Sequence, residues 1–182
     1  MDMCKHGELE LAQALFEQDP NIDISAFNDR AFCFACYNGH LHVVQWLLCV
    51  KPDIDISANN EKAFQLACLN GHLHVAQWLL DVKPDINISA LEEEAFRLAC
   101  VYGHLQVTQW LLSAKPEINI SAHNEYAFWW ACYNGHLRVA LWLLYVKPDI
   151  DMTHASQTIQ EKIYTSLLLY CFDHKNINML ML

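Results

Sequence analysis

The sequence predicts an all-α solenoid of stacked helix–turn–helix units that repeat every 32 residues. Self-similarity at a fixed period of this size is typical of repeat architectures. Apolar residues also recur at helical rather than strand spacing through most of the chain. The turn-forming residues are few and periodic. All five glycines and all five prolines follow the same spacing, at Gly7, Gly39, Gly71, Gly103 and Gly135 and at Pro20, Pro52, Pro84, Pro116 and Pro148.

The composition limits the class of protein. The chain has 182 residues, 54% of them apolar, which is enough for a sizeable core and argues against disorder. A net charge of −10 repels phosphate backbones, so nucleic acid is not the expected partner. No apolar run is long enough to cross a membrane, and residues 1–15 carry acids where a signal peptide would be apolar. We therefore expect a soluble, intracellular protein without a membrane partner.

In the unit that spans residues 57–88, the first helix is expected over residues 57–69. Ser57 is the expected N-cap, and the equivalent Ser89 is followed three residues later by Glu92, as in a capping box. Helical spacing places the apolar residues on one buried face, namely Ala63, Phe64, Ala67 and Cys68. Asn70 and Gly71 then end the helix, because glycine and asparagine accept the left-handed conformation that follows a helix.

The second helix of the unit is expected over about residues 72–82. Its apolar residues surround most of the helix, so neighbouring units must cover both flanks. One column of this helix is tryptophan in every full unit and is expected in the core: Trp46, Trp78, Trp110 and Trp142. The polar stripe of His74, Gln77 and Asp81 should face solvent. Lys83 ends the helix because it precedes Pro84, and residues 85–88 lead in extended form to the next unit.

These residues resemble a known family. Residues 67–80, Ala-Cys-Leu-Asn-Gly-His-Leu-His-Val-Ala-Gln-Trp-Leu-Leu, are similar to the helix, Gly-His-Leu turn and second helix of the ankyrin repeat. Asp85-Ile86-Asn87 resembles its Asp-Val-Asn. The match recurs in every full unit and covers about residues 4–151. The repeated Trp-Leu-Leu and Lys-Pro-Asp-Ile most resemble the ankyrin proteins encoded by giant viruses of amoebae.

The sequence also departs from the ankyrin pattern. Lys62-Ala63-Phe64-Gln65 stands where the family usually has Thr-Pro-Leu-His, and each unit is one residue shorter than the usual length of about 33. We therefore expect short or reduced fingers with an earlier helix start, rather than well-formed β-hairpins.

The repeat columns divide the chain into three parts. Residues 1–24 form a partial N-terminal repeat, residues 25–152 four ankyrin-like repeats, and residues 153–182 a divergent helical C-terminal cap. In the last part, Ile159, Ile163, Leu167 and Tyr170 keep helical spacing and predict a closing helix over residues 157–172, with a further turn over residues 177–182. Terminal repeats must shield the stack from water, which favours a cap; a docking segment is the alternative.

No catalytic site, metal site, cofactor or small-molecule substrate is expected. Cys33 and Cys36 form an isolated Cys-x-x-Cys, whereas structural zinc needs four converging ligands. Equivalent cysteines of neighbouring units lie about 10 Å apart, which suits buried thiols in a reducing compartment better than disulfides. One histidine follows the turn glycine in every full unit, which favours a repeated turn-stabilising hydrogen bond over catalysis: His40, His72, His104 and His136.

Columns that vary between units indicate a contact surface. Variation gathers at the start of the first helix and just before the turn, and the ankyrin resemblance implies that these two zones line the concave, partner-binding face. The predicted partner-binding residues are Tyr37, Asn38, Lys62, Leu69, Asn70, Glu94, Val101, Tyr102, Tyr126, Trp129, Tyr133 and Asn134. Tyrosine is enriched at protein interfaces, which favours contact over a merely drifting surface. Trp130 is expected in the core, whereas for Trp129 packing and an exposed anchor remain equally open.

The sequence therefore predicts a non-catalytic protein–protein interaction module that binds a partner protein through its concave face. The acidic surface favours a basic partner. The alternative is a targeting adaptor that brings a host protein to a ubiquitin ligase or another modifying enzyme, for which only the C-terminal tail remains as a docking segment. The expected location is the host cytoplasm.

Overall fold

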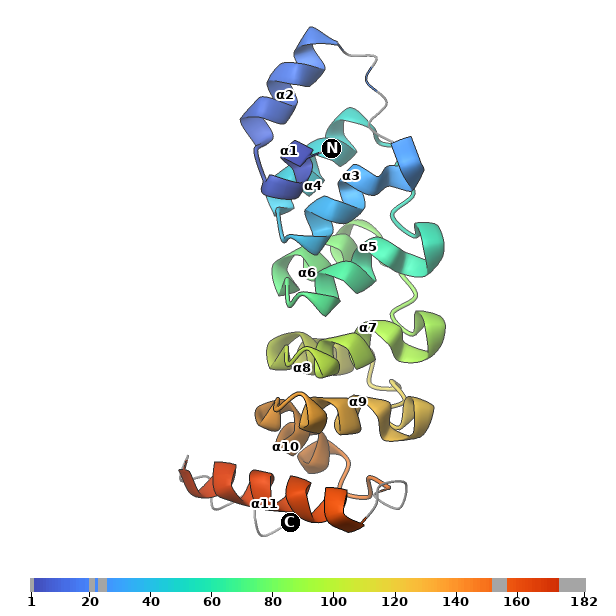
Figure 1. The fold of residues 1–182 in the computed structure, drawn as a ribbon. Helices are drawn as coiled ribbons and strands as arrows, with labels where there is room; N and C mark the ends of the chain where they lie inside the picture. Colours follow the sequence, from blue (N-terminus) through green and yellow to red (C-terminus); the bar gives the residue numbers. More distant parts are fainter. Residues whose placement is uncertain (1, 20–21, 23–25, 152–156, 174–182) are drawn as a thin grey trace. The chain divides into compact units, whose positions relative to one another are not determined.

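The computed structural model describes residues 2–19, 22, 26–151 and 157–173, and all regular secondary structure within these ranges is α-helical (Figure 1). The helices are α1 (Asp2–His6), α2 (Leu9–Gln18), α3 (Ala26–Tyr37), α4 (Leu41–Val50), α5 (Ala58–Leu69), α6 (Leu73–Val82), α7 (Ala90–Val101), α8 (Leu105–Ala114), α9 (Ala122–Tyr133), α10 (Leu137–Val146) and α11 (Gln157–Asp173). The predicted all-α repeat fold is confirmed. No helix within the described ranges is long and apolar enough to span a membrane.

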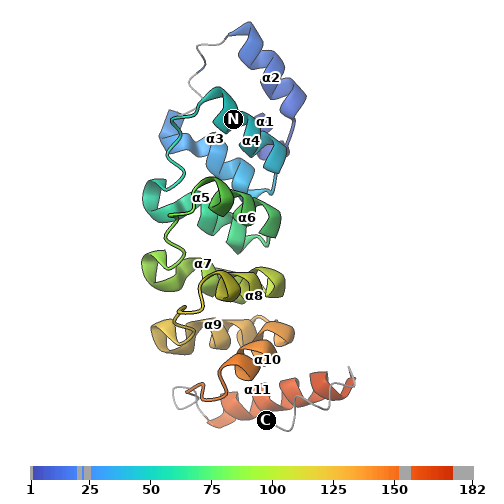
Figure 2. The ribbon, with the colours of Figure 1, turned by 180° about the vertical axis from the view of Figure 1, so that it is seen from behind.

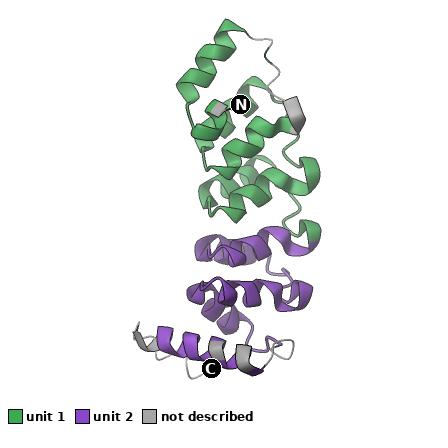
Figure 3. Cartoon of the chain, viewed as in Figure 1, with its two compact units in different colours: residues 1–91 green, residues 92–182 purple. Residues whose placement is uncertain are grey.

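The chain forms two compact units, residues 1–91 and residues 92–182 (Figure 3). In the first unit, α1 packs against α2 and α3, α3 against α4 and α5, and α5 against α6. In the second unit, α10 packs against α8, α9 and α11. Figures 1 and 2 show the two helices of each pair side by side from opposite sides. Helix–turn–helix pairs are therefore the building block of each unit.

The ends of the paired helices follow the predicted local chemistry. After α5, Gly71 adopts a φ of 76°, and the His72 amide donates a hydrogen bond to the Ala67 carbonyl at 2.9 Å. This left-handed glycine turns the chain into α6. At the other end of α6, the Lys83 amide still bonds to the Leu79 carbonyl at 2.9 Å, but Pro84 has no amide hydrogen to continue the series.

The core consists of repeated columns of phenylalanine, leucine and small residues. The largest fully buried side chains are Phe32, Phe64, Phe96 and Phe128 from the first helices and Leu47, Leu79, Leu111 and Leu143 from the second. Cys36, Cys68 and Cys100 are also fully buried. The prediction of a tryptophan core column is wrong: Trp46, Trp78, Trp110 and Trp142 are half-buried. Leu79, which follows Trp78, takes the central position, and the indole lies at the edge of the core.

Each first helix begins with a left-handed turn that the sequence did not predict. In α5, Asn59, Asn60 and Glu61 have φ angles of 55°, 60° and 65°. The equivalent residues of α7 and α9 also have positive φ: Leu91, Glu92 and Glu93, and His123, Asn124 and Glu125. A non-glycine residue in this conformation costs about 1–2 kcal/mol. Ser57 and Ser121 lie at the N-cap positions but form no side-chain capping hydrogen bond, so the predicted serine caps are wrong.

The left-handed turns of α5, α7 and α9 each place a glutamate in the interior: Glu61, Glu93 and Glu125. The Oε1 atom of Glu61 accepts the Asn87 amide at 3.1 Å, and Glu93 accepts the Asn119 amide at 3.3 Å. Glu125 is only 4% exposed and accepts the Asp151 amide at 3.4 Å. Each carboxylate thus holds the extended segment that leaves its own helix pair. This arrangement replaces a β-hairpin, in agreement with the predicted reduced fingers.

The handedness of this turn can be tested at Asn124, which is exposed and has a φ of 57°. In a left-handed turn, Asn124→Gly should give a protein about 1 kcal/mol more stable than Asn124→Ala, because alanine disfavours positive φ. In an ordinary right-handed helix the order would reverse by a similar amount. Urea denaturation of the two variants decides between these outcomes. An alanine variant that is the more stable of the two contradicts the turn.

Three of the histidines that follow a turn glycine contact the turn glycine of the preceding repeat: His40, His72 and His136. His40 Nε2 donates a hydrogen bond to the Lys5 carbonyl at 3.0 Å, and its ring covers Gly7. The His72 ring covers Gly39 in the same way. For His40, the predicted turn-stabilising hydrogen bond is therefore made to the turn of the preceding repeat. Its role is to join neighbouring repeats.

The contact between His72 and Gly39 predicts that a glycine-to-alanine substitution lowers stability more at Gly39 than at Gly135, although the two glycines have nearly the same backbone conformation. Gly39 and Gly135 have φ angles of 76° and 77°. A Cβ on Gly39 would meet the His72 ring, whereas one on Gly135 would have no atom within 4 Å among the described residues. Gly135→Ala should cost about 1–2 kcal/mol from the backbone alone, and Gly39→Ala about 1 kcal/mol more from displacement of the ring. Equal losses in urea denaturation would contradict the packing role of His72.

The helices at the two ends differ from the middle repeats. The short α1 precedes Gly7 as each first helix precedes its turn glycine, and the partial N-terminal repeat remains a prediction. The predicted closing helix over residues 157–172 is present as α11, and its Leu167 is buried. The further turn predicted over residues 177–182 lies outside the described residues. The division at residues 24 and 152 remains a prediction.

Candidate functional site

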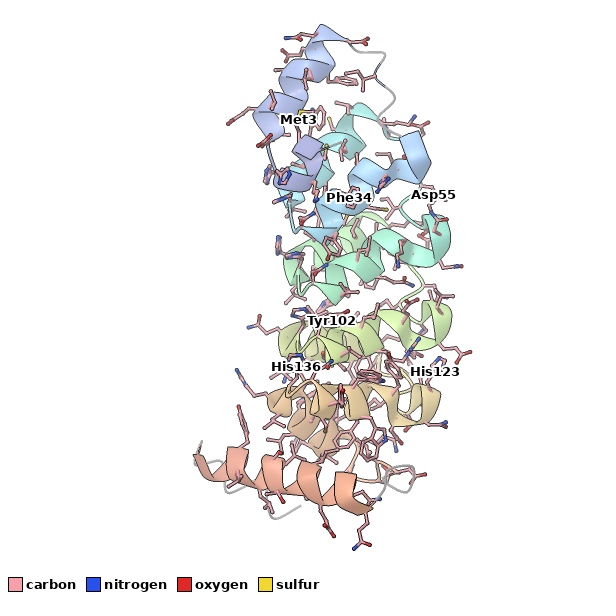
Figure 4. All side chains as sticks on the ribbon, viewed as in Figure 1. Met3, Phe34, Asp55, Tyr102, His123 and His136 are labelled. Carbon is pink, nitrogen blue, oxygen red and sulfur yellow. The ribbon has the colours of Figure 1, made fainter. Side chains whose placement is uncertain are left out.

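One side of each first helix carries partly or fully exposed residues that differ from repeat to repeat. These sets are Arg30, Phe34 and Tyr37 on α3 with Asn38 after it; Lys62, Leu66 and Leu69 on α5 with Asn70 after it; Glu94 and Leu98 on α7 with Tyr102 after it; and Tyr126, Trp130 and Tyr133 on α9 with Asn134 after it. Figure 4 labels Phe34 and Tyr102 among them. The first two sets belong to the first unit and the last two to the second.

In the first unit, this surface is partly occupied by its own contacts. The Arg30 guanidinium lies over the Phe34 ring, 5.0 Å from its centre. Asn38 Nδ2 donates to the Phe34 carbonyl at 2.8 Å, within the same helix. Asn70 Nδ2 does the same with the Leu66 carbonyl at 3.3 Å. Tyr37 is exposed, whereas Lys62 and Leu69 are half-buried. These asparagines therefore stabilise helix ends rather than join helices.

In the second unit, three aromatic side chains form a continuous row along α9, which we call the aromatic ladder: Tyr126, Trp130 and Tyr133. The ring centres of Tyr126 and Trp130 lie 5.7 Å apart. Those of Trp130 and Tyr133 lie 5.3 Å apart, with the planes at 73°. Trp130 is 40% exposed and Tyr133 81% exposed. The spacing of four and three residues puts all three on one face of the helix.

Three contacts fix α7 beside α9. At the start of the helices, Glu92 Oε2 lies 3.0 Å from His123 Nε2. In the middle, the Arg97 guanidinium lies over the Tyr126 ring, 5.4 Å from its centre. At the end, Asn134 Nδ2 donates to the Val101 carbonyl at 2.8 Å. This last bond sets the positions of the neighbouring Tyr102, which is 52% exposed, and Tyr133. The aromatic surface of the second unit is therefore held from both ends.

The predicted binding residues differ in how far the structure exposes their side chains. Tyr37, Tyr102, Tyr133 and Asn134 are exposed, and Asn38, Lys62, Leu69, Asn70, Glu94, Tyr126 and Trp129 are half-buried. Val101, the last residue of α7, is only 8% exposed. Its side chain is therefore buried and does not belong to the proposed surface. Trp129 packs edge-on against Phe128 at 5.4 Å, and its indole Nε1 is buried. This geometry favours packing over an exposed anchor.

The sequence interpretation missed two contributors to this surface. Trp130 was predicted in the core and is exposed, so that prediction is wrong. Arg97 was not selected, although its guanidinium supports Tyr126. The signal for Trp130 was present in the helical spacing from Tyr126 to Tyr133. It was overlooked because the equivalent residues in the other repeats are apolar: Phe34, Leu66 and Leu98.

The chemistry of these surfaces is suited to contact. Burial raises the pKa of the Cys100 and Cys132 thiols to about 12 and that of Cys36 well above its ordinary value. These thiols are therefore protonated near neutral pH and poorly nucleophilic. Within the described residues, no group of three or more His, Cys, Asp or Glu side chains is arranged to hold a metal ion. The groups available to contact a partner are exposed aromatic rings, an amide and carboxylates.

Comparison with known proteins gives a consistent fold. A family model described as "Ankyrin repeats (3 copies)" matches residues 1–90, and one described as "Ankyrin repeats (many copies)" matches residues 97–144. An ankyrin repeat family protein from Legionella pneumophila is similar in structure, with a TM-score of 0.55 and 22% sequence identity. The match covers 93% of this chain and 68% of that one, and at this identity it shows the fold alone. No curated protein matches the sequence.

Proposed function

The chain belongs to the ankyrin-repeat family, whose repeats serve as protein–protein interaction modules, and we propose that it binds a partner protein through α7 and α9. The observation that carries this proposal is the aromatic ladder. Large exposed aromatic side chains dominate the energetics of protein interfaces. Here Trp130 and Tyr133 stand beside Tyr102 on a surface that no described residue covers completely.

The rigidity of this surface supports a binding role. The contacts of His123 with Glu92 and of Asn134 with Val101 hold the two helices together at both ends. Aromatic side chains also have few rotatable bonds, so little conformational freedom is lost when a partner docks. A pre-organised surface of this kind binds without any chemical step, which agrees with the non-catalytic character of ankyrin scaffolds.

Binding of a purified partner tests the proposal. A partner captured from amoebal extract would be purified and titrated against the wild type, Trp130→Leu, and the double variant Tyr102→Ala with Tyr133→Ala. Leucine occupies the position of Trp130 in two other repeats, as Leu66 and Leu98, so the fold should tolerate it. We expect each variant to raise the Kd by about thirtyfold, a size typical of interface hot spots, with little change in Tm.

Tyr145→Ala is the matched control. Tyr145 is 60% exposed but lies on α10, a second helix, away from the aromatic ladder. Its removal should leave the Kd unchanged. Equal weakening by Tyr145→Ala, or wild-type affinity in the ladder variants, would place the binding surface elsewhere. Unfolding of the double tyrosine variant would show that these side chains are structural.

We extend the proposal to a basic partner, an intracellular location in a reducing host cytoplasm, and an origin among giant viruses of amoebae. The net charge of −10 supports the basic partner. Buried, unpaired thiols such as Cys68 support the reducing compartment. The repeated Trp-Leu-Leu and Lys-Pro-Asp-Ile support the viral origin.

A second candidate function is that of an adaptor between a host protein and a ubiquitin ligase or another modifying enzyme. It is supported by α11, which buries Leu167 but exposes Tyr164, Leu168 and Leu169. An exposed apolar stripe on a terminal helix is a suitable contact for an enzyme subunit. Purification of wild type and Leu168→Asp in parallel tests this role. Ligase subunits recovered with the wild type and lost with the variant would support it, and their absence from both would exclude it.

A further inference from the structure

The aromatic ladder already binds one guanidinium group of its own chain, and a similar contact occurs in the first unit. Arg97 lies over Tyr126 with its guanidinium carbon 5.4 Å from the ring centre, and Arg30 lies over Phe34 at 5.0 Å on α3. A cation within about 6 Å of an aromatic centre is attracted by the negative face of the ring. The first of these pairs joins α7 to α9 and the second lies within α3, so both place an arginine over an aromatic ring, at different positions of the repeat.

The next two rings along α9 have no such cation. Within the described part of the chain, no arginine or lysine stacks on Trp130 or Tyr133. The planes of these rings meet at 73° with their centres 5.3 Å apart, which is an edge-to-face arrangement. We call this pair of rings, Trp130 and Tyr133, the corner. Tryptophan is the strongest of the aromatic side chains in cation–π contact. The corner can therefore accept a cation from a partner, one helical turn beyond Tyr126, whose ring already contacts Arg97.

The net charge of the second unit favours an incoming cation. Residues 92–151 contain seven Asp and Glu but four Lys and Arg. On α7, Glu92 is paired with His123, whereas the half-buried Glu94 carboxylate has no hydrogen-bond or ion-pair partner among the described residues. Glu94 lies at the position equivalent to Tyr126, on the same exposed face of the helices. A carboxylate on this face of the helices attracts basic side chains and repels acidic ones.

We infer that the partner presents a basic peptide segment whose arginine guanidinium stacks in the corner of Trp130 and Tyr133, with a second basic residue directed toward Glu94. This inference rests on the proposed function and specifies the partner of the same surface. Arginine suits the corner better than lysine because its guanidinium is planar, stacks on aromatic faces and is more weakly hydrated. The hydrogen bond from Asn134 to the Val101 carbonyl keeps the corner in place before the peptide arrives.

Selection from a phage-displayed library of random short peptides tests the inference. The full-length wild type and Trp130→Leu would be immobilised and used in parallel, and peptides enriched on the wild type alone would be synthesised. Each arginine would then be replaced by citrulline, which keeps the planar shape but carries no charge. We expect arginine to be enriched and one citrulline replacement to weaken binding by about tenfold. Glu94→Gln should reduce the affinity less and lower its salt dependence.

The outcomes separate this inference from the proposed function. If peptides bind the wild type in preference to Trp130→Leu but tolerate every citrulline replacement, the surface binds peptides and the arginine inference is overturned. Peptides that bind both proteins equally, or a selection that enriches none on the wild type, contradict the proposed surface itself. If the selected peptides contain lysine instead of arginine and lose binding when that lysine is acetylated, the surface binds a cation, and the choice of arginine is overturned.

Discussion

Replacing Phe64 by alanine is expected to lower the free energy of unfolding by about 3–5 kcal/mol. Phe64 is fully buried in the first unit and belongs to the column that fills the centre of every repeat. Its removal eliminates the transfer free energy of the ring and leaves a cavity between packed helices, which relax only in part. Urea denaturation monitored by circular dichroism measures the loss.

Trp78→Ala provides the comparison on the partner helix α6. Tryptophan is the larger side chain, but Trp78 is half-buried, so part of its surface already contacts water. We expect a loss smaller than that of Phe64→Ala, by at least about 1 kcal/mol, because stability follows the apolar area removed from water. A larger loss for Trp78→Ala would show that the indole, rather than the phenylalanine column, organises the core.

The elements that depend on local chemistry could be predicted from the sequence. Gly71 marks the end of α5 because glycine readily adopts positive φ, and Pro84 marks the end of α6 because proline has a fixed φ and no amide hydrogen, whatever lies around them. The burial of Phe64 follows from helical spacing within a single unit. These features gave the helix boundaries, the repeat length and the central column of the core.

Depth of burial across the repeats could not be predicted in the same way. Trp78 and Trp130 both lie within apolar patterns, yet one is half-buried and the other exposed. Periodicity identifies an apolar face but not how far a neighbouring helix covers it. Trp130 lies on the side of α9 that also carries Tyr126 and Tyr133, so their shared spacing was the only available sign of a surface row.

The left-handed turns illustrate a different limit. Asparagine tolerates positive φ, but Leu91 and Glu93 do not favour it, so residue preferences alone point to an ordinary helix start. The turn is stabilised by contacts distant in sequence. Glu93 reaches the amide of Asn119, which lies 26 residues away. Such a contact is visible only once the path of the extended segment is known.

Replacing Glu125 by alanine is expected to lower the free energy of unfolding by about 3 kcal/mol, the second largest effect predicted for this chain. Glu125 Oε1 accepts the Ser121 hydroxyl at 2.7 Å and the Asp151 amide at 3.4 Å, and it lies 3.9 Å from Lys147 Nζ. Alanine removes the acceptor from both donors and leaves the lysine without its buried partner. Hydrogen bonds to charged groups contribute about 1.5–3 kcal/mol each.

Two further variants separate the carboxylate from the backbone conformation. Glu125 has a φ of 61°, so Glu125→Gly relieves backbone strain while it removes the same hydrogen bonds as alanine. Glu125→Gln keeps an oxygen acceptor and the side-chain volume but loses the charge. We expect stability to fall in the order wild type, Gln, Gly and Ala, measured by urea denaturation. If glycine equals or exceeds the wild type, backbone strain outweighs the contacts of Glu125, and the buried carboxylate does not hold the segment at Asp151.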